Sequence, residues 1–250
     1  MSNFDSENQE STIYVDIGNS SIKIGFLSDE KWVVHSHQSS QDAARQINNH
    51  MYPVKHIFLS SVRETVKLAL ENEIEIRNLK EVKTSDIPSL NLDYETPETL
   101  GIDRYLACLG AFSASKKGVV VIDAGSACTI DYMNEQGVFQ GGVIMPGFRS
   151  IMSVFKETAP ELPEIKIGIP EHFPGKSTKE SLQWGQVGFF VDGVISILEA
   201  YDEKYDDYDL FLTGGDAGIL FELLGHVGEV NPHLVLMGLK EAAASRVSSQ

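Results

Sequence analysis

The sequence predicts an α/β protein built from two similar halves, and two observations lead to this prediction. An apolar strand that ends in Asp-x-Gly and small polar residues occurs at residues 13–21 and again, about a hundred residues later, at 120–127. Around each copy, the apolar pattern follows the same order of a three-stranded meander, a helix, a strand and a helix. Such a repeated order is typical of a duplicated α/β chain.

Apolar runs bounded by turn residues define the elements of the first half. We expect strands at 13–16, 21–27, 31–35 and 56–60, and the range 74–82 contains strand-like material. Helical spacing, weak in the first range, predicts helices at 40–50, 64–73 and 102–115. The polar run 1–11 predicts a disordered tail and not a signal peptide, and residues 85–97 predict an irregular loop.

The second half begins after Lys116-Lys117-Gly118, so the sequence predicts one domain at 12–116 and another at 117–250. Strands are expected at 119–122, 128–133, 138–145 and 210–213, with a hairpin turn at 134–137. Helices are expected to begin at 148 and to span 178–200 and 233–247. Residues 160–173 predict a proline-containing loop, and residues 202–209 an acidic one.

The Asp-x-Gly turns predict phosphate binding. Glycine lets the backbone approach an anion, small side chains leave its N–H groups accessible, and the aspartate can hold a cation. The pair therefore suggests a nucleotide phosphate held between two half-domains.

Composition fits a soluble enzyme and excludes several other classes. The chain has 250 residues, 42% of them apolar, which is enough for a sizeable core. Its net charge of −16, without any Lys/Arg-rich run, argues against a nucleic-acid partner. Cys108 and Cys128 are expected to be buried thiols of a cytoplasmic protein, because two cysteines make no zinc or disulfide framework. No run reaches transmembrane length, and neither a histidine ligand spacing nor a nucleophile elbow is present.

Further motifs lie between and after the two turns. They are Gly101-Ile102-Asp103-Arg104, the Gly-Gly-Val-Ile-Met-Pro-Gly run at 141–147, and Thr213-Gly214-Gly215-Asp216. In this joint order and spacing, from about residue 13 to about residue 239, the chain resembles type III pantothenate kinases. The resemblance implies the duplicated ribonuclease-H-like domains of the actin-like ATPase superfamily, with an ATP cleft between them. Ser126 stands where a threonine is commoner in the family, and serine keeps the hydroxyl.

The resemblance also implies roles for individual residues. ATP would be bound by Asp16, Ile17, Gly18, Asn19, Ser20, Ser21, Ile22, Lys23 and Ser126. Pantothenate would be bound by Tyr94, Gly101, Ile102, Asp103, Arg104 and Thr178. Asp103 would be the base that takes the proton from the primary hydroxyl of pantothenate. Asp16 would lie near Mg²⁺, directly or through water, and Asp123 would hold K⁺ or NH₄⁺.

Structural alternatives stay open for several of these residues. Lys23 could be a solvated edge residue, Tyr94 an ordinary loop aromatic, and Arg104 a salt-bridge partner of Asp103. Ser177 and Glu180 fit a helix capping box next to Thr178. If a helix starts near Ile102, its dipole favours an ionised Asp103 with an ordinary or lowered pKa. Such a weak base is acceptable, because positioning and charge stabilisation carry most of phosphoryl transfer.

The expected function is therefore that of a homodimeric ATP:pantothenate phosphotransferase, acting at the first step toward coenzyme A. Within the family, the 141–147 segment lies near both the dimer interface and the pantothenate pocket. Two other hypotheses remain: a kinase of another small acceptor on the same fold, and a non-catalytic ATP-binding regulatory protein. Screening of other acceptors distinguishes a kinase of another small molecule from a pantothenate kinase. ATP binding without turnover of any acceptor would favour the regulatory protein.

Overall fold

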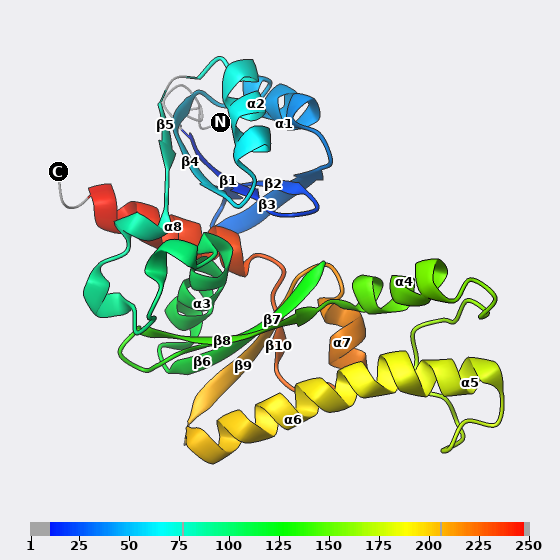
Figure 1. The fold of residues 1–250 in the computed structure, drawn as a ribbon. Coiled ribbons are helices and arrows are strands. Elements are labelled where there is room, and N and C mark those ends of the chain that lie inside the picture. The colour runs from blue at the N-terminus through cyan, green and yellow to red at the C-terminus, as the bar shows by residue number, and fades with distance from the viewer. Residues whose placement is uncertain (1–10, 77, 206, 248–250) are drawn as a thin grey trace, which may run out of the picture. The chain divides into compact units, whose positions relative to one another are not determined.

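The computed structural model describes residues 11–76, 78–205 and 207–247, which form two compact units (Figure 1). One unit runs up to Ala114 and takes in the segment from His233 onward, and the other spans Ser115–Pro232. The sequence-based domains meet at 116/117 and place the closing helix in the second half, whereas the structure groups that helix with the first unit. Except for Ser11, the predicted disordered tail lies outside the described residues. The Ser11 N–H donates to the Pro53 carbonyl at 2.9 Å as the first strand begins.

The first unit contains a five-stranded sheet in the order β3-β2-β1-β4-β5. Its first three strands form the predicted antiparallel meander, and β4 and β5 run parallel to β1. The strands are β1 (Ser11–Ile17), β2 (Ile22–Ser28), β3 (Lys31–His37), β4 (Val54–Ser61) and β5 (Leu79–Glu81).

The second unit repeats this topology strand for strand, in the order β10-β9-β6-β7-β8. The strands are β6 (Gly118–Ala124), β7 (Ala127–Met133), β8 (Phe139–Pro146), β9 (Tyr208–Thr213) and β10 (Glu229–Val230). In both sheets the central strand pairs antiparallel with the next strand and parallel with a later one. The predicted duplication of ribonuclease-H-like domains is confirmed, and each Asp-x-Gly turn follows a central strand.

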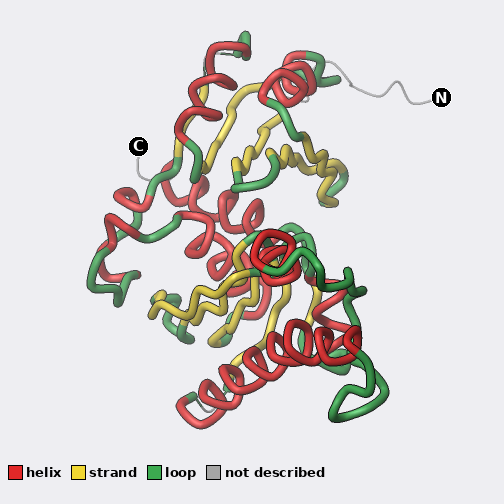
Figure 2. Tube along the Cα trace, turned by 45° about the vertical axis from the view of Figure 1, so that its right-hand side comes forward, coloured by secondary structure: helices red, strands yellow, loops and turns green. Residues whose placement is uncertain are grey.

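Helices flank the sheets (Figure 2). They are α1 (Ser40–Asn48), α2 (Glu64–Glu73), α3 (Ile102–Ser115), α4 (Phe148–Thr158), α5 (Thr178–Gln183), α6 (Phe189–Lys204), α7 (Ala217–Leu223) and α8 (Leu234–Val247). The loop predicted at 85–97 contains short 3₁₀ turns. No helix in the described part of the chain is both long and apolar enough to cross a lipid bilayer.

The helix predicted at 178–200 differs from the structure in its middle and at its end. A five-residue π-helix, Trp184–Gly188, lies between α5 and α6, and α6 continues to Lys204. The Trp184 ring lies over Gly188, where an added Cβ would come within 2.6 Å of it. Most of the predicted acidic loop at 202–209 is therefore the end of α6 and the start of β9.

Each unit has its own apolar core. In the first, alternate residues of β1 face α1 and α2, and the buried set includes Ile13, Val15, Ile17, Ile24, Ile47, Leu59 and Leu70. In the second, β6 is buried along its run of Val119–Ile122, as expected for a strand that is covered on both faces. Its core includes Val120, Ile122, Ile130, Phe148, Phe190, Val194 and Leu212.

Two glycines let α3 and α8 cross with their backbones in contact. A Cβ on Gly238 of α8 would overlap the carbonyl oxygen of Leu106, and a Cβ on Gly110 of α3 would overlap that of Leu234. Helix α8 also packs against β1 and β4. The crossing therefore ties α3, whose first turn carries Asp103, to the first sheet.

We predict that Gly238→Ala lowers the free energy of unfolding by about 1–3 kcal/mol or more, because the two backbones must separate to admit the methyl group. Urea denaturation measures the loss. Gly218→Ala is the matched control, since Gly218 is an exposed helical glycine with open space around its Cβ position, and there alanine should be neutral or stabilise by up to about 1 kcal/mol. A Gly238→Ala variant as stable as the parent would contradict this account of the crossing.

Candidate active site

The first Asp-x-Gly turn has the features of a phosphate-binding loop. It joins β1 to β2 between the paired residues Ile17 and Ile22, and the Gly18 N–H donates to the Ser21 carbonyl at 3.1 Å. Asn19 and Ser20 are exposed. Gly18 has no positive φ, and an added Cβ would meet nothing nearer than the Ser21 oxygen at 3.7 Å. Contacts within the chain therefore do not require glycine here, and its absent side chain leaves the backbone open to a ligand.

Asp16 is a buried carboxylate directly before this turn. It is 7% exposed, and Ser60 Oγ donates to its Oδ1 at 3.3 Å from the neighbouring strand β4. Oxygen donors of this kind suit a hard cation, which needs only one or two carboxylates if it keeps several waters. The described residues contain no cluster of three or more His, Cys, Asp or Glu side chains arranged to hold a metal ion.

Lys23 is the cross-strand neighbour of Asp16. Strand β2 lies between β1 and β3, so the alternative reading of Lys23 as a residue of an edge strand is wrong. Its side chain is half-buried. Burial, followed by the positive charge of Lys23, lowers the pKa of His233. Lys23 thus places a positive charge directly after the turn, on the strand beside Asp16.

The segment from Gly101 to Arg104 begins α3 at Ile102, as predicted. Ile102 is buried, and Asp103 lies in the first turn of the helix. The Arg104 N–H donates to Asp103 Oδ1 at 3.0 Å, so the carboxylate bends back over the start of the helix. A Cβ on Gly101 would come within 2.5 Å of the same oxygen. Glycine at position 101 therefore leaves the space that this carboxylate occupies.

Burial raises the pKa of Asp103 and outweighs the backbone hydrogen bonds and the charge of Arg104, which lower it. The expectation of an ordinary or lowered pKa is therefore wrong. It considered the helix dipole and left out the burial of the carboxyl. A raised pKa makes Asp103 a stronger base than an exposed aspartate.

Tyr94 and Arg104 lie together, as the substrate-binding prediction requires. The guanidinium carbon of Arg104 is 6.0 Å from the centroid of the Tyr94 ring. Arg104 is only 8% exposed, and Tyr94 is half-buried. Tyr94 therefore packs on the arginine that follows Asp103.

The second Asp-x-Gly turn, in the other unit, accepts hydrogen bonds from the segments that follow β8 and β9. The Ser126 carbonyl accepts hydrogen bonds from the Gly147 N–H at 3.1 Å and from Ser150 Oγ at 2.9 Å. The Ala124 carbonyl accepts one from the Asp216 N–H at 2.9 Å. The Gly-rich segments after β8 and β9 thus meet at this turn, and the Ser126 side chain is exposed beside them.

Asp123 lies against the backbone at the end of β9. Gly214 has a φ of +94°, and an added Cβ there would overlap the Asp123 carboxylate. Burial, followed by the charges of Asp123 and Asp131, raises the pKa of Cys128 to about 12. The sequence did not single out Asp131 or Asp216, which are 2% and 5% exposed. Asp216 belongs to a motif that was noted, but nothing near Asp131 signals its burial.

Thr178 is the first residue of α5 and is exposed. Ser177 is the N-cap, and its Oγ accepts the Glu180 N–H at 3.2 Å, so that part of the capping prediction is confirmed. The Glu180 carboxylate accepts the N–H of Lys176 at 2.6 Å. The Thr178 hydroxyl is thus not the capping group. Thr178, Asp123 and Ser126 lie in one unit, and the other predicted site residues lie in the other.

Comparisons with known proteins agree with these features. The family model described as type III pantothenate kinase matches residues 12–200. A type III pantothenate kinase of Cytophaga hutchinsonii is 33% identical over 229 residues, which cover 91% of this chain and 96% of that protein.

Solved structures share the fold. A conserved putative Baf family transcriptional activator from Campylobacter jejuni, 24% identical, matches with a TM-score of 0.59 over 95% of this chain and 100% of that one. The ethanolamine utilization protein EutJ from Carboxydothermus hydrogenoformans, 12% identical, matches with a TM-score of 0.52 over 94% of this chain and 90% of that one. The two-unit α/β architecture is thus one that several proteins share.

We predict that the Asp103 carboxyl titrates above the usual value for aspartate of about 3.9, because burial favours its protonated form. Carbon-13 NMR of the aspartate carboxyl groups measures this, and the signal that disappears in Asp103→Asn identifies the residue. Titration at or below the usual value would contradict the effect of burial.

Proposed function

Because the chain belongs to the type III pantothenate kinase family, we propose that it transfers the γ-phosphoryl group of ATP to pantothenate. The product would be 4′-phosphopantothenate, the first intermediate toward coenzyme A. The observation that carries the proposal is the half-buried Asp103 in the first turn of α3, next to Arg104 and near Tyr94, in a chain that matches the family model. A carboxylate can accept the proton of an alcohol, and a guanidinium can bind the negative charge of the same substrate.

In this proposal Asp103 accepts the proton of the primary hydroxyl of pantothenate. The hydroxyl oxygen forms a bond to the γ-phosphorus, the bond from that phosphorus to the β,γ-bridging oxygen breaks, and ADP leaves with the bond's electron pair. The raised pKa of Asp103 suits the acceptance of a proton better than that of an exposed carboxylate would. Arg104 would bind the carboxylate of pantothenate, because a guanidinium matches the geometry of that group, and the Tyr94 ring packs against it.

The first turn would hold the phosphates of ATP. Its members are Asp16, Ile17, Gly18, Asn19, Ser20, Ser21, Ile22 and Lys23, of which Ile17 and Ile22 anchor the turn in the core. The open Gly18 backbone and the half-buried Lys23 support this role. Ser126 would contact ATP from the second turn, and Thr178 would contact pantothenate.

Two cations belong to the proposal. The oxygen-donor environment of Asp16 fits Mg²⁺, directly or through water, and Asp123 fits K⁺ or NH₄⁺ beside nearby backbone carbonyls. When bound, these ions would neutralise phosphate charge. We also place the enzyme in the cytoplasm, since Cys108 and Cys128 are free buried thiols, as is usual in a reducing compartment.

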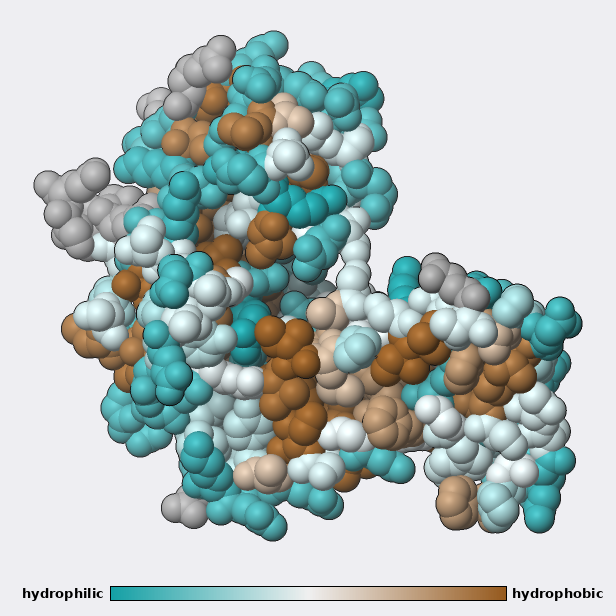
Figure 3. Space-filling model, in the orientation of Figure 1, coloured by the Kyte–Doolittle hydropathy of each residue, from teal (hydrophilic) through white to brown (hydrophobic). Residues whose placement is uncertain are grey.

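The proposed assembly is a homodimer, supported by an apolar surface on the second unit. Strand β8 lies at the edge of its sheet, and its adjacent residues Val143 and Ile144 are 36% and 62% exposed. Strand alternation turns these two side chains to opposite faces. On α6, Phe189 is 69% exposed, and a Cβ on Gly193 would lie 4.0 Å from the Met145 methyl group. Figure 3 shows that brown, apolar residues reach the surface in the view of Figure 1. An unpaired apolar edge of this kind favours association with a second copy.

We predict pantothenate-dependent ADP formation from MgATP in potassium buffer and much less in sodium buffer. A coupled assay measures it, with sugars, acetate and pantetheine as alternative acceptors. Absence of pantothenate-dependent ADP in potassium would overturn the proposed function. ATP binding without turnover of any acceptor would favour the regulatory hypothesis.

Within that assay, Asp103→Asn should abolish detectable turnover, a loss of roughly 10²–10⁴-fold or more, while calorimetry shows retained ATP binding. The control is Asp29→Asn, because Asp29 is an exposed turn residue with a φ of 49°, a conformation that asparagine tolerates. Near-normal activity of Asp103→Asn would show that another group is the base.

We predict that Ile144→Lys shifts the protein from twice the chain mass toward the chain mass, because a charge on the edge of β8 opposes burial of that strand. Light scattering during size-exclusion chromatography measures the mass. Met51→Lys is the matched control, since Met51 is an 84% exposed methionine of the other unit. A dimer that survives Ile144→Lys unchanged would place the interface elsewhere.

A further inference from the structure

Arg63 lies two residues after β4, the strand that runs beside the first phosphate turn. Strand β4 runs parallel to β1, with Ser60 in register with Asp16 and Ser61 with Ile17. The Val62 N–H then donates to the Ile17 carbonyl at 3.1 Å. Since parallel strands end at the same edge of a sheet, the residue after Val62 emerges next to Gly18.

Local hydrogen bonds hold the Arg63 backbone in place. The Arg63 N–H donates to Ser61 Oγ at 3.1 Å, and the same hydroxyl donates to the Arg63 carbonyl at 3.1 Å. Arg63 has an extended backbone, with φ −131° and ψ 93°, and α2 begins at the next residue. The origin of its long side chain is therefore fixed at the edge of the sheet.

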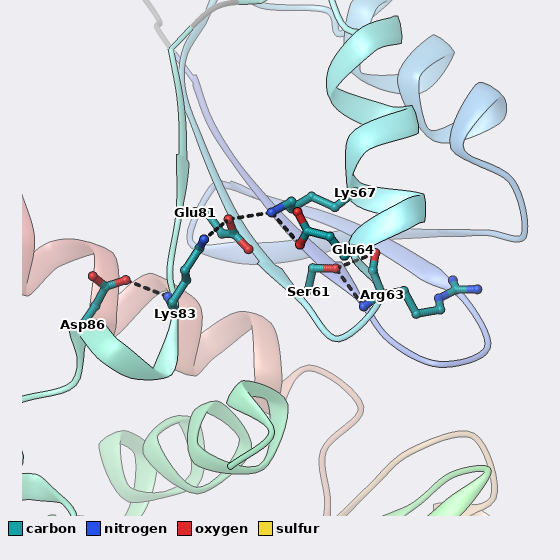
Figure 4. A network of polar contacts seen from close by, with 7 residues as sticks. All are labelled: Ser61, Arg63, Glu64, Lys67, Glu81, Lys83 and Asp86. Atoms are coloured by element: carbon teal, nitrogen blue, oxygen red, sulfur yellow. Dashed lines mark hydrogen bonds and ion pairs between the residues drawn. The ribbon is translucent and has the colours of Figure 1, made fainter. Parts of the chain in front are cut away.

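The carboxylates around Arg63 already bind other cations. Lys67, with a side chain only 6% exposed, lies 2.8 Å from Glu64 and 2.9 Å from Glu81. Lys83 also pairs with Glu81, at 3.2 Å. Figure 4 shows this network and the Arg63 side chain pointing away from it.

Arg63 itself has no anionic partner within the described ranges 11–76, 78–205 and 207–247. Its Nε is buried and finds no acceptor there. In a chain with a net charge of −16, an arginine left without a carboxylate is unexpected on electrostatic grounds. A guanidinium held beside an open anion-binding turn has the geometry to bind phosphate oxygens through two N–H groups.

We infer that Arg63 binds the phosphate chain of the nucleotide held at the first turn. This role rests on the proposed function for the identity of the nucleotide. The terminal nitrogens of the guanidinium donate to phosphate oxygens, and the positive charge adds to that of Lys23. Arg63 is thus a nucleotide-binding residue between β4 and α2, outside the Asp-x-Gly motif.

The test measures the affinity for ATP, ADP and adenosine by calorimetry. Arg63→Ala should weaken ATP and ADP binding by roughly 10-fold or more and leave adenosine binding unchanged, because the lost contact is to phosphate. Arg63→Gln, which keeps most of the side-chain length, should lose affinity in the same way, and Arg63→Lys should recover part of it. The control is Arg45→Ala, since Arg45 is an exposed arginine of the same unit paired with Asp42 at 3.1 Å.

The outcomes separate this inference from the proposed function. If a thermal melt without nucleotide shows that Arg63→Ala is destabilised, the nucleotide affinities of Arg63→Gln are used to test the inference instead. ATP affinity within twofold of the parent in the folded variant, or an equal loss for adenosine, would overturn the inference. A parent that binds ATP without phosphorylating pantothenate would refute the proposed function and leave the role of Arg63 standing. A parent that binds no ATP would refute both.

Discussion

Parallel pairing of the central strand with a strand from later in the chain is the constraint on which the two turns depend. Because β4 lies beside β1 and β9 beside β6, each Asp-x-Gly turn emerges next to the end of a parallel neighbour. That neighbour supplies Ser60 to Asp16 in the first unit and places Gly214 against Asp123 in the second. The chemistry of each turn is thus shared between two distant segments, and the duplicated topology repeats the arrangement.

The second constraint is the close contact of α3 with α8. Gly110 and Gly238 bring the two backbones together, and Leu236 of α8 reaches the position where a Cβ of Gly25 would lie on β2. The last helix of the chain therefore braces the helix that carries Asp103 against the first sheet. A residue at the far end of the sequence thus contributes to the rigidity of the candidate base.

The sequence predicted the features that depend on local patterns. The two meanders, the strands β4 and β9 and the start of α3 at Ile102 follow from apolar periodicity and turn residues. Strand β10 has only two residues, and α7 follows the Gly-Gly turn without a distinct start signal, so neither was predicted. The π-helix at Trp184 and the grouping of α8 with the first unit depend on tertiary packing. The raised pKa of Asp103 was not predicted either, because burial outweighs the backbone hydrogen bonds and the charge of Arg104, which lower it. Arg63 carries no motif, and only the register of β4 with β1 draws attention to it.

The burial of Asp103 also has a consequence for the free energy of folding. Since the pKa of this carboxyl is higher in the folded chain than in the unfolded one, the folded state binds the proton more tightly. Its contribution to stability is most favourable at acid pH, declines as the pH rises from the unfolded pKa to the folded one, and is unfavourable at neutrality. The fold therefore opposes the ionised form of Asp103, which is the form that accepts a proton. Under the proposed function, selection for a base at this position and selection for maximal stability act in opposite directions.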